Sequence, residues 1–414
     1  MAASRSVTYR RAHAVLHPDV ARSPVVAGRT GTTRHHPEQP GARQREQMTS
    51  TLEGTTPPPA GAPRPARARD RSVSVYAELS QQVKDAGLLN RRRPYYVVSI
   101  ALAVAAFAGT WVAIVALGDS WWQLALAVVF SLVCTQFGFL GHDTAHRQAF
   151  GSHRANEWSA RVLSCGFAGI GYGWWMQKHN RHHNAPNQMG KDPDIESAVL
   201  AFTPDDAEQR MSGLRGWWTR HQGWAFFPLL CLEGLALHAN SIATLAREKS
   251  MPHRRLELAI IGVRLGVFVA AVFLVMPPLI GIGFIVVQQA VFGLLLGGSF
   301  APNHKGMPIV PKNAKVDFLR RQVLMSRNIR GGVLTDFMMG GLNYQIEHHL
   351  FPSMPRPNLK KVQPLVREHC AKHGISYTET SLVGSYRIVV RYLNRVGLAE
   401  RDPFTCPLVA SVRN

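Results

Sequence analysis

Two long apolar stretches constrain the fold of this 414-residue chain more than any other feature of its sequence. Residues 95–141 and 256–300 are almost free of charge, and each is about twice the roughly 20 residues that a helix needs to cross a bilayer. We therefore expect two helical hairpins, with spans at about 95–117, 121–141, 256–276 and 279–300. The predicted fold class is an all-α integral membrane protein with four transmembrane helices and a cytosolic helical cap.

The segments outside these stretches suggest the rest of the domain organisation. Residues 1–71 are rich in Pro, Arg, Ala and Ser, and we expect a disordered basic tail. Residues 72–94 are expected to form an amphipathic juxtamembrane helix, and residues 95–414 the membrane domain. Residues 224–245 are apolar but carry Glu233 and His238, so we expect a helix at the interface or buried in the cap, with a fifth span as the alternative.

The formal charge of +21 comes from 47 Lys and Arg against 26 Asp and Glu. Such a charge raises the possibility of a nucleic-acid partner, but basic residues beside membrane spans are expected on the cytoplasmic side. Arg91, Arg92 and Arg93 directly precede the first apolar stretch, and the turns at 118–120 and 277–278 carry no Lys or Arg. We therefore expect no nucleic acid, and we place both termini and the polar segments in the cytoplasm, at the plasma membrane if the source is bacterial.

Eight of the 18 histidines fall into four short clusters next to or between the apolar stretches. The clusters are His142 and His146 in GHDTAH; His179, His182 and His183 in KHNRHH; His304 in FAPNHKG; and His348 and His349 in NYQIEHH. Residues three or four apart on a helix share a face, so each multiple cluster can direct its imidazoles at one point. The ends of the second and fourth spans place His142 and His304 at the same face of the membrane.

This histidine pattern predicts a metal centre. Neutral imidazole is a ligand for iron, copper and zinc, and eight ligands are too many for one ion, whereas two ions with about four ligands each fit the count. A lone histidine is more often structural. We therefore assign structural roles to the remaining histidines outside the tail: His153, His221, His238, His253, His369 and His373.

The order of the clusters, HxxxH, HxxHH and QxxHH around two membrane hairpins, resembles the membrane fatty acid desaturase family. The likeness covers about residues 76–381, and the run NYQIEHHLFPSMPRPNL resembles the front-end and linoleoyl-type acyl desaturases. Gln345 stands where many acyl-CoA delta-9 desaturases have histidine, which favours the front-end type.

The resemblance implies a reaction and its cofactors. The eight clustered histidines would bind two iron ions (Fe2+), molecular oxygen would be the co-substrate, and a fatty acyl chain, as acyl-CoA or acyl-lipid in the membrane, would be desaturated. No catalytic residues beyond these ligands are implied. Gln345 and Asn303 would contribute directly, through water or by orienting ligands, and Asp143, Asp192 and Asp194 could orient ligand imidazoles. Asn303 could instead cap a helix, and Asp194 could be a solvated loop residue.

Electrons would have to come from a separate protein, because the chain lacks the HPGG signature of a fused haem domain. We expect a ferredoxin and its reductase, or a similar donor. The alternatives are an acyl or alkane hydroxylase or a carotenoid ketolase on the same scaffold. A metal-binding membrane transporter fits less well, because its ligands would lie at mid-membrane depth, whereas these clusters flank the spans.

Overall fold

The computed structural model describes residues 68–399, most of which are helical. Helix α1 (Ala68–Asp85) begins within the last four residues of the predicted tail, and the rest of that tail lies outside the described residues. Two of the apolar side chains on α1, Leu79 and Val83, are fully buried in a cluster with residues of the polar part of the protein. The apolar face of this helix therefore packs against protein.

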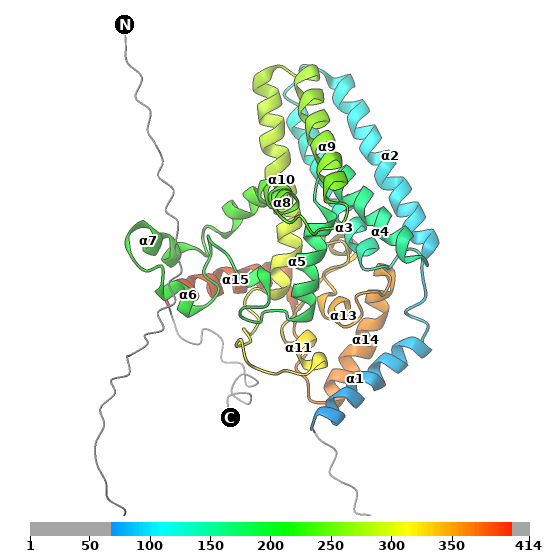
Figure 1. Cartoon of the computed structure of the whole chain (residues 1–414), viewed down its shortest axis with the longest axis vertical. Coiled ribbons are helices and arrows are strands. Elements are labelled where there is room, and N and C mark those ends of the chain that lie inside the picture. Colours follow the sequence, from blue (N-terminus) through cyan, green and yellow to red (C-terminus); the bar gives the residue numbers. More distant parts are fainter. Residues whose placement is uncertain (1–67, 400–414) are drawn as a thin grey trace, which may run out of the picture. The chain divides into compact units, whose positions relative to one another are not determined.

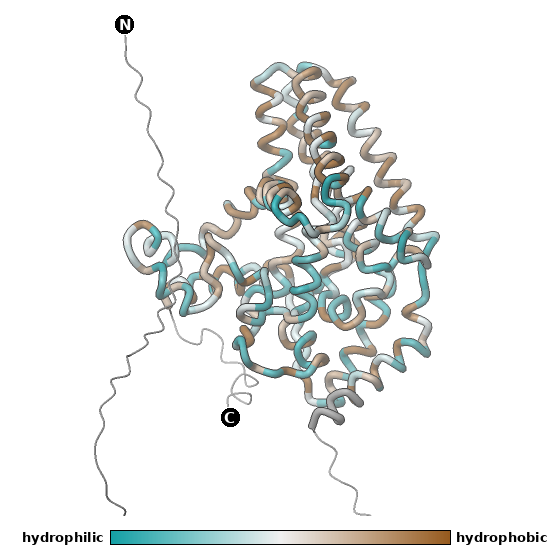
Figure 2. The backbone as a smooth tube through the Cα atoms, in the orientation of Figure 1, coloured by the Kyte–Doolittle hydropathy of each residue, from teal (hydrophilic) through white to brown (hydrophobic). Residues whose placement is uncertain are grey.

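Four long helices coincide with the four predicted spans. They are α2 (Arg93–Leu117), α3 (Gln123–Ala145), α9 (Arg254–Val275) and α10 (Pro278–His304). Figure 1 shows that α2 with α3 and α9 with α10 form hairpins whose turns lie at the same end. Figure 2 shows that the hydrophobic residues are concentrated on these helices and that the opposite part of the protein is more hydrophilic.

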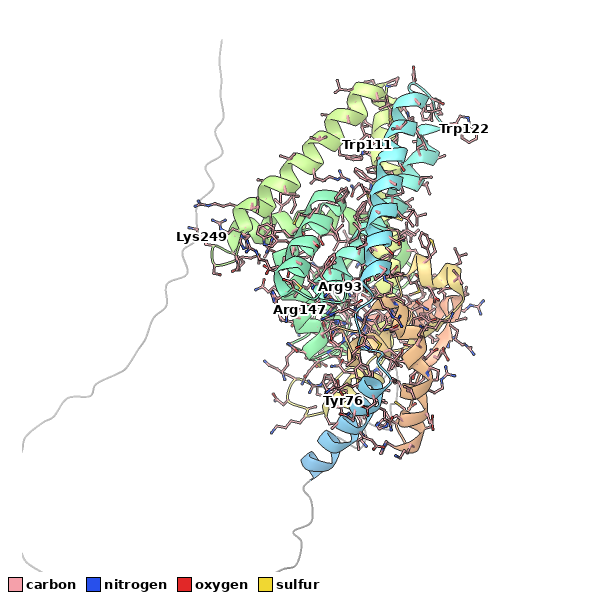
Figure 3. The ribbon with its side chains drawn as sticks, turned by 90° about the vertical axis from the view of Figure 1, so that its right-hand side faces the viewer. Tyr76, Arg93, Trp111, Trp122, Arg147 and Lys249 are labelled. Carbon is pink, nitrogen blue, oxygen red and sulfur yellow. The ribbon has the colours of Figure 1, made fainter. Side chains whose placement is uncertain are left out.

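The side chains mark the two ends of the first hairpin. Figure 3 shows Trp122 at the turn and Arg93 and Arg147 at the opposite end, where the long helices meet the polar part. Between these ends, phenylalanine rings join the helices: Phe130 of α3 stacks on Phe268 of α9, with ring centroids 5.6 Å apart. Tryptophan and arginine at opposite ends of an apolar bundle are typical of interface positions.

A fifth helix, α8 (Phe226–Arg247), is also long and apolar enough to cross a membrane, although length and composition are the only grounds for this. This is the segment that the sequence placed at the interface or in the cap, with a span as the alternative. In Figure 1, α8 runs across the hairpins and not alongside them. The structure therefore contains five candidate membrane helices among its described residues, one more than the four predicted spans.

Shorter elements form the polar part of the protein. Those before α8 are α4 (His153–Arg161), the π-helix η1 (Val162–Ala168), α5 (Tyr172–Asn184), the 3-10 helix η2 (Pro193–Ile195), α6 (Pro204–Glu208) and α7 (Gly213–His221). Those after α10 are α11 (Phe318–Leu324), β1 (Asn328–Arg330), α12 (Val333–Met338), α13 (Gln345–Leu350), α14 (Arg356–Lys372), β2 (Glu379–Ser381) and α15 (Leu382–Gly397). The strands β1 and β2 pair in parallel, with Asn328 opposite Glu379, so the predicted all-α class is correct except for this three-residue ladder.

Helices α8 and α10 approach closely because glycines line their contact. A Cβ at Gly293 of α10 would lie 2.6 Å from the backbone nitrogen of Gly234 and closer still to the carbonyl oxygen of Leu230. Small residues allow helix backbones to pack at short range inside apolar surroundings. This contact fixes α8 across the helix that ends at His304.

We predict that Gly293→Ala lowers the melting temperature of the detergent-purified protein, because an added methyl group in a packed contact costs roughly 1–3 kcal/mol. Gly262→Ala on α9 is the matched control, since a Cβ there would meet no atom within 4 Å and alanine favours a helix. Thermal unfolding followed by circular dichroism measures both. Equal melting temperatures for the two variants would contradict the close approach of α8 and α10.

Candidate metal centre

The structure brings the eight clustered histidines together at one end of the long helices. His142 and His146 lie at the end of α3, and His304 is the last residue of α10. The other five come from α5 and α13: His179, His182, His183, His348 and His349. Residues separated by more than 200 positions in sequence therefore meet because both hairpins end at the same level (Figure 1).

The histidines form two groups. His142, His146, His179 and His348 offer four ring nitrogens within 4.8 Å of one another, and His182, His304 and His349 offer three within the same distance. His183 lies between the groups: its Nε2 is 3.1 Å from His348 Nε2, and its ring stacks on that of His349 with centroids 4.2 Å apart. The arrangement can hold two cations side by side, with His183 next to both.

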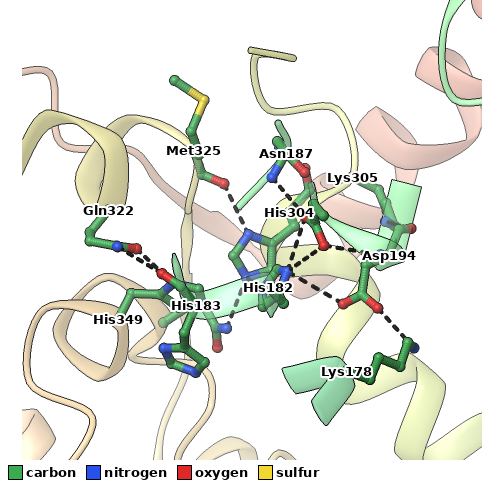
Figure 4. A network of polar contacts seen from close by, with 12 residues as sticks. Lys178, His182, His183, Asn187, Asp194, His304, Lys305, Gln322, Met325 and His349 are labelled. Carbon is green, nitrogen blue, oxygen red and sulfur yellow. Dashed lines mark hydrogen bonds and ion pairs between the residues drawn. The ribbon is translucent and has the colours of Figure 1, made fainter. Parts of the chain in front are cut away.

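Hydrogen bonds at Nδ1 orient the imidazoles of the second group, as Figure 4 shows. His182 Nδ1 lies 3.0 Å from Asp192 Oδ2, His304 Nδ1 lies 2.9 Å from the carbonyl oxygen of Met325, and His349 Nδ1 lies 2.9 Å from Gln322 Oε1. These oxygens only accept, so each Nδ1 carries the proton and each Nε2 presents a lone pair. This is the usual way in which outer residues fix a metal-binding histidine.

Several of these lone pairs have no adequate partner within the described protein. His142 Nε2 and His349 Nε2 are buried and make no hydrogen bond there. His182 Nε2 faces His304 Nε2 at 3.3 Å, although Nδ1 already holds the proton in both rings. Buried polar atoms are rarely left unpaired, and a cation among the Nε2 atoms would satisfy them. The residues therefore fit a metal centre.

Burial lowers the pKa of most of these imidazoles and so favours the neutral form that binds metals. Burial, helped by the neighbouring histidines, holds the pKa of His179, His183, His348 and His349 well below the usual histidine value. Burial also lowers the pKa of His182, but Asp192 and Asp194 outweigh it and leave a net increase. The Asp192 contact therefore adds negative charge beside the second group.

The other predicted site residues take varied positions around the centre. Gln345 lies in contact with the second group, with Nε2 2.9 Å from His304 Nε2. Asn303 lies one step further out, where its amide nitrogen is 3.4 Å from Gln345 Oε1 and 2.9 Å from the Ser299 carbonyl within α10. Asn303 therefore does not cap the start of a helix, since it lies in the last turn of α10.

The three aspartates also lie near the histidines. Asp143 Oδ1 is 3.4 Å from His142 Nδ1, and its Oδ2 pairs with Arg356 Nε at 2.7 Å. Asp192 accepts a hydrogen bond from the backbone nitrogen of Asn187 as well as from His182 Nδ1. Asp194 is part of the same network, because it pairs with Lys178 at 2.8 Å and lies 3.4 Å from His182 Nδ1.

Two residues that orient ligands had no signal in the sequence. Gln322 belongs to α11, and Met325 acts through its backbone carbonyl. Neither stands near a histidine cluster in the chain, and a backbone carbonyl leaves no mark in a sequence. His153, His221, His238 and His253 lie in neither group.

A hydrogen-bond network positions the helix that carries His348 and His349. Asn328 of β1 accepts from the backbone of Ile346 at 2.9 Å and donates to Glu347 at 2.7 Å. Tyr377 donates to the same carboxylate at 2.7 Å. The short sheet therefore anchors α13 through side chains adjacent to the ligands.

Comparison with known proteins agrees with this geometry. The family model described as fatty acid desaturase matches residues 119–381. An acyl-lipid (9-3)-desaturase of Physcomitrium patens is 31% identical over 76% of this chain and 61% of that protein. A corresponding enzyme of Borago officinalis is 30% identical over 66% of this chain and 63% of that protein. A delta(6)-fatty-acid desaturase of Caenorhabditis elegans is 28% identical over 79% and 75%.

The match thus spans about three-fifths of the length of the first two relatives. The family match over residues 119–381 includes all eight clustered histidines, which lie between residues 142 and 349. The chain belongs to the fatty acid desaturase family.

Proposed function

We propose that this protein is an oxygen-dependent fatty acyl desaturase, which inserts a double bond into a long acyl chain of a membrane lipid or an acyl-CoA. The observation that carries the proposal is the convergence of eight imidazoles, six of them buried and two partly buried, in two adjacent groups. Bound iron would supply oxygen activation and the removal of hydrogen from two neighbouring methylene carbons. The chain's own residues bind the metals, fix their ligands and position the acyl chain.

Each group of histidines would hold one iron ion. His142, His146, His179 and His348 would bind the first, and His182, His304 and His349 the second, with His183 completing the set between them. Asp143, Asp192, Gln322 and the Met325 carbonyl hold Nδ1 protons and so keep the Nε2 lone pairs directed at the metals. Gln345, which contacts His304, would lie beside the second ion, and Asn303 would hold the Gln345 side chain in place.

The apolar surroundings of the first group suit a hydrocarbon substrate. The Trp175 ring stacks on that of His179, with ring centroids 4.1 Å apart. The ring centroid of Phe300 lies 6.2 Å from that of His142. Trp175 belongs to α5, and Phe300 belongs to the long apolar helix α10 itself. An acyl chain that reaches this group from the bilayer would meet aromatic rings beside the metal ligands.

The proposed topology has four spans, α2, α3, α9 and α10, with both termini and the metal centre in the cytoplasm. The parity of crossings supports this. His142 at the end of α3 and His304 at the end of α10 lie at one site, so an even number of crossings must separate them. Helices α9 and α10 supply two; a crossing by α8 would make three and put the two histidines on opposite sides.

A ferredoxin and its reductase, or a similar external donor, would deliver the electrons. The basic composition of the chain, with its net charge of +21, favours an acidic partner. Oxygen-dependent desaturation consumes two electrons beyond those taken from the substrate, so the reaction needs such a donor.

We predict that expression in a bacterial host with a compatible ferredoxin system yields new unsaturated fatty acids, measured by mass spectrometry of total lipids. His179→Ala and His349→Ala should abolish them, because each removes a ligand from one group. His221→Ala is the control and should retain the product, since that exposed ring bonds only the Trp217 carbonyl. Hydroxy acids in place of alkenes would move the assignment to a hydroxylase.

The topology makes a separate prediction. Fusions of green fluorescent protein, which folds in the cytoplasm, should fluoresce after residues 223 and 250, on both sides of α8. Alkaline phosphatase, active outside the cytoplasm, should be active when fused after residues 119 and 277, at the two hairpin turns. Opposite locations for residues 223 and 250 would show that α8 crosses the membrane and would contradict the four-span proposal.

A further inference from the structure

A third group of ligand-type side chains lies outside the candidate metal centre. Glu78 of α1, His369 of α14 and His373, which follows α14, offer ligand atoms within 4.8 Å of one another. The group joins the first described helix to the helix that follows α13. None of the three contacts the eight clustered histidines.

The two histidines are arranged as a chelating pair. They stand four residues apart, so their rings lie on one side of α14, with centroids 4.5 Å apart. His369 is 3% exposed, and burial together with His373 lowers its pKa, which keeps the ring neutral. The Nε2 atoms of both rings are buried without a hydrogen-bond partner in the described protein.

The backbone of α1 and the carboxylate of Glu78 complete the arrangement. The His369 ring is hydrogen-bonded to the backbone of Val75, which leaves the unpaired Nε2 facing the group. Glu78 Oε2 lies 3.6 Å from His373 Nε2. Its other oxygen, Oε1, pairs with Lys372 Nζ at 2.6 Å. One carboxylate oxygen is therefore engaged by the lysine, and the other faces the histidines.

We propose that Glu78, His369 and His373 form a second metal site, separate from the eight-histidine centre, that binds one borderline divalent cation of the Zn2+ class. Two imidazoles and one carboxylate are a common ligand set for zinc, with water in the fourth position. Both Nε2 atoms are buried and make no hydrogen bond in the described protein, which favours a bound cation, because buried polar atoms are rarely left without a partner. A bound ion would fasten α1 to α14.

Lys372 predicts the direction in which a mutation should change the affinity for the metal. Its ammonium group lies beside the carboxylate that the cation would use, so it repels the cation and weakens binding. Lys372 is largely exposed, and water and salt reduce the repulsion. Removing this charge should therefore tighten binding of the metal by roughly three- to tenfold. An ordinary ion-pair cluster would show no such gain.

The sequence shows the two histidines of this site but not its carboxylate. The run HCAKH has the same HxxxH spacing as the first histidine cluster, and the assignment of structural roles to His369 and His373 overlooked this spacing. Glu78 reaches them only because α1 packs against α14.

The test uses the full-length, iron-loaded protein, purified without a polyhistidine tag and dialysed against buffered Zn2+. Inductively coupled plasma mass spectrometry counts zinc per chain, and a zinc titration gives the affinity. We expect the wild type to bind one zinc more than the His369→Ala/His373→Ala variant, and Lys372→Gln to bind that zinc more tightly. His179→Ala should retain this zinc, which separates the site from the proposed iron centre.

His153→Ala is the matched control, because His153 also pairs with a carboxylate, Glu157, one helical turn away but has no third ligand. It should bind zinc as the wild type does. Equal zinc content in the wild type and the double histidine variant would overturn the proposal. If that variant fails to fold, Lys372→Gln decides alone: an unchanged or weaker zinc affinity would overturn it.

Discussion

The structure depends on the burial of imidazole rings whose lone pairs face one another. His182 and His304 bring their Nε2 atoms within 3.3 Å while each Nδ1 proton is held elsewhere. Such a contact is unfavourable in a protein interior unless something positive lies between the lone pairs. The second group is thus suited to hold a cation, and the surrounding hydrogen bonds direct lone pairs toward the place that such an ion would occupy.

The apolar helices provide the frame for this arrangement. The hairpins end at the same level, so the ends of α3 and α10 supply His142, His146 and His304 to one place. Helix α5 adds three histidines, and its start is fixed by the backbone nitrogen of Gly173, which donates to Glu257 of α9 at 2.9 Å. Glu257 also pairs with Arg161 at 2.9 Å, away from solvent. This buried ion pair in the first turn of α9 thereby positions α5, which contributes histidines to both groups.

Local spacing made the long helices and the eight histidines predictable. Charge-free runs mark each long helix, and HxxxH or HxxHH spacing marks rings that share a helix face. The transverse course of α8 was less predictable, because it depends on glycine contacts with α10 and not on composition. Gln322 and the Met325 carbonyl act across long sequence separations, and the β1–β2 ladder that holds Asn328 is only three residues long. Tertiary contacts of this kind leave no periodic pattern.

Iron stoichiometry tests the central claim most directly. The protein, reconstituted with Fe2+ in the absence of oxygen and freed of loosely bound metal, should contain about two iron ions per chain by inductively coupled plasma mass spectrometry. The His304→Ala variant should keep about one, because it disrupts only the second group. A wild-type content of one iron or less, or complete loss of iron in His304→Ala with its fold intact, would contradict a centre made of two adjacent histidine-ligated sites.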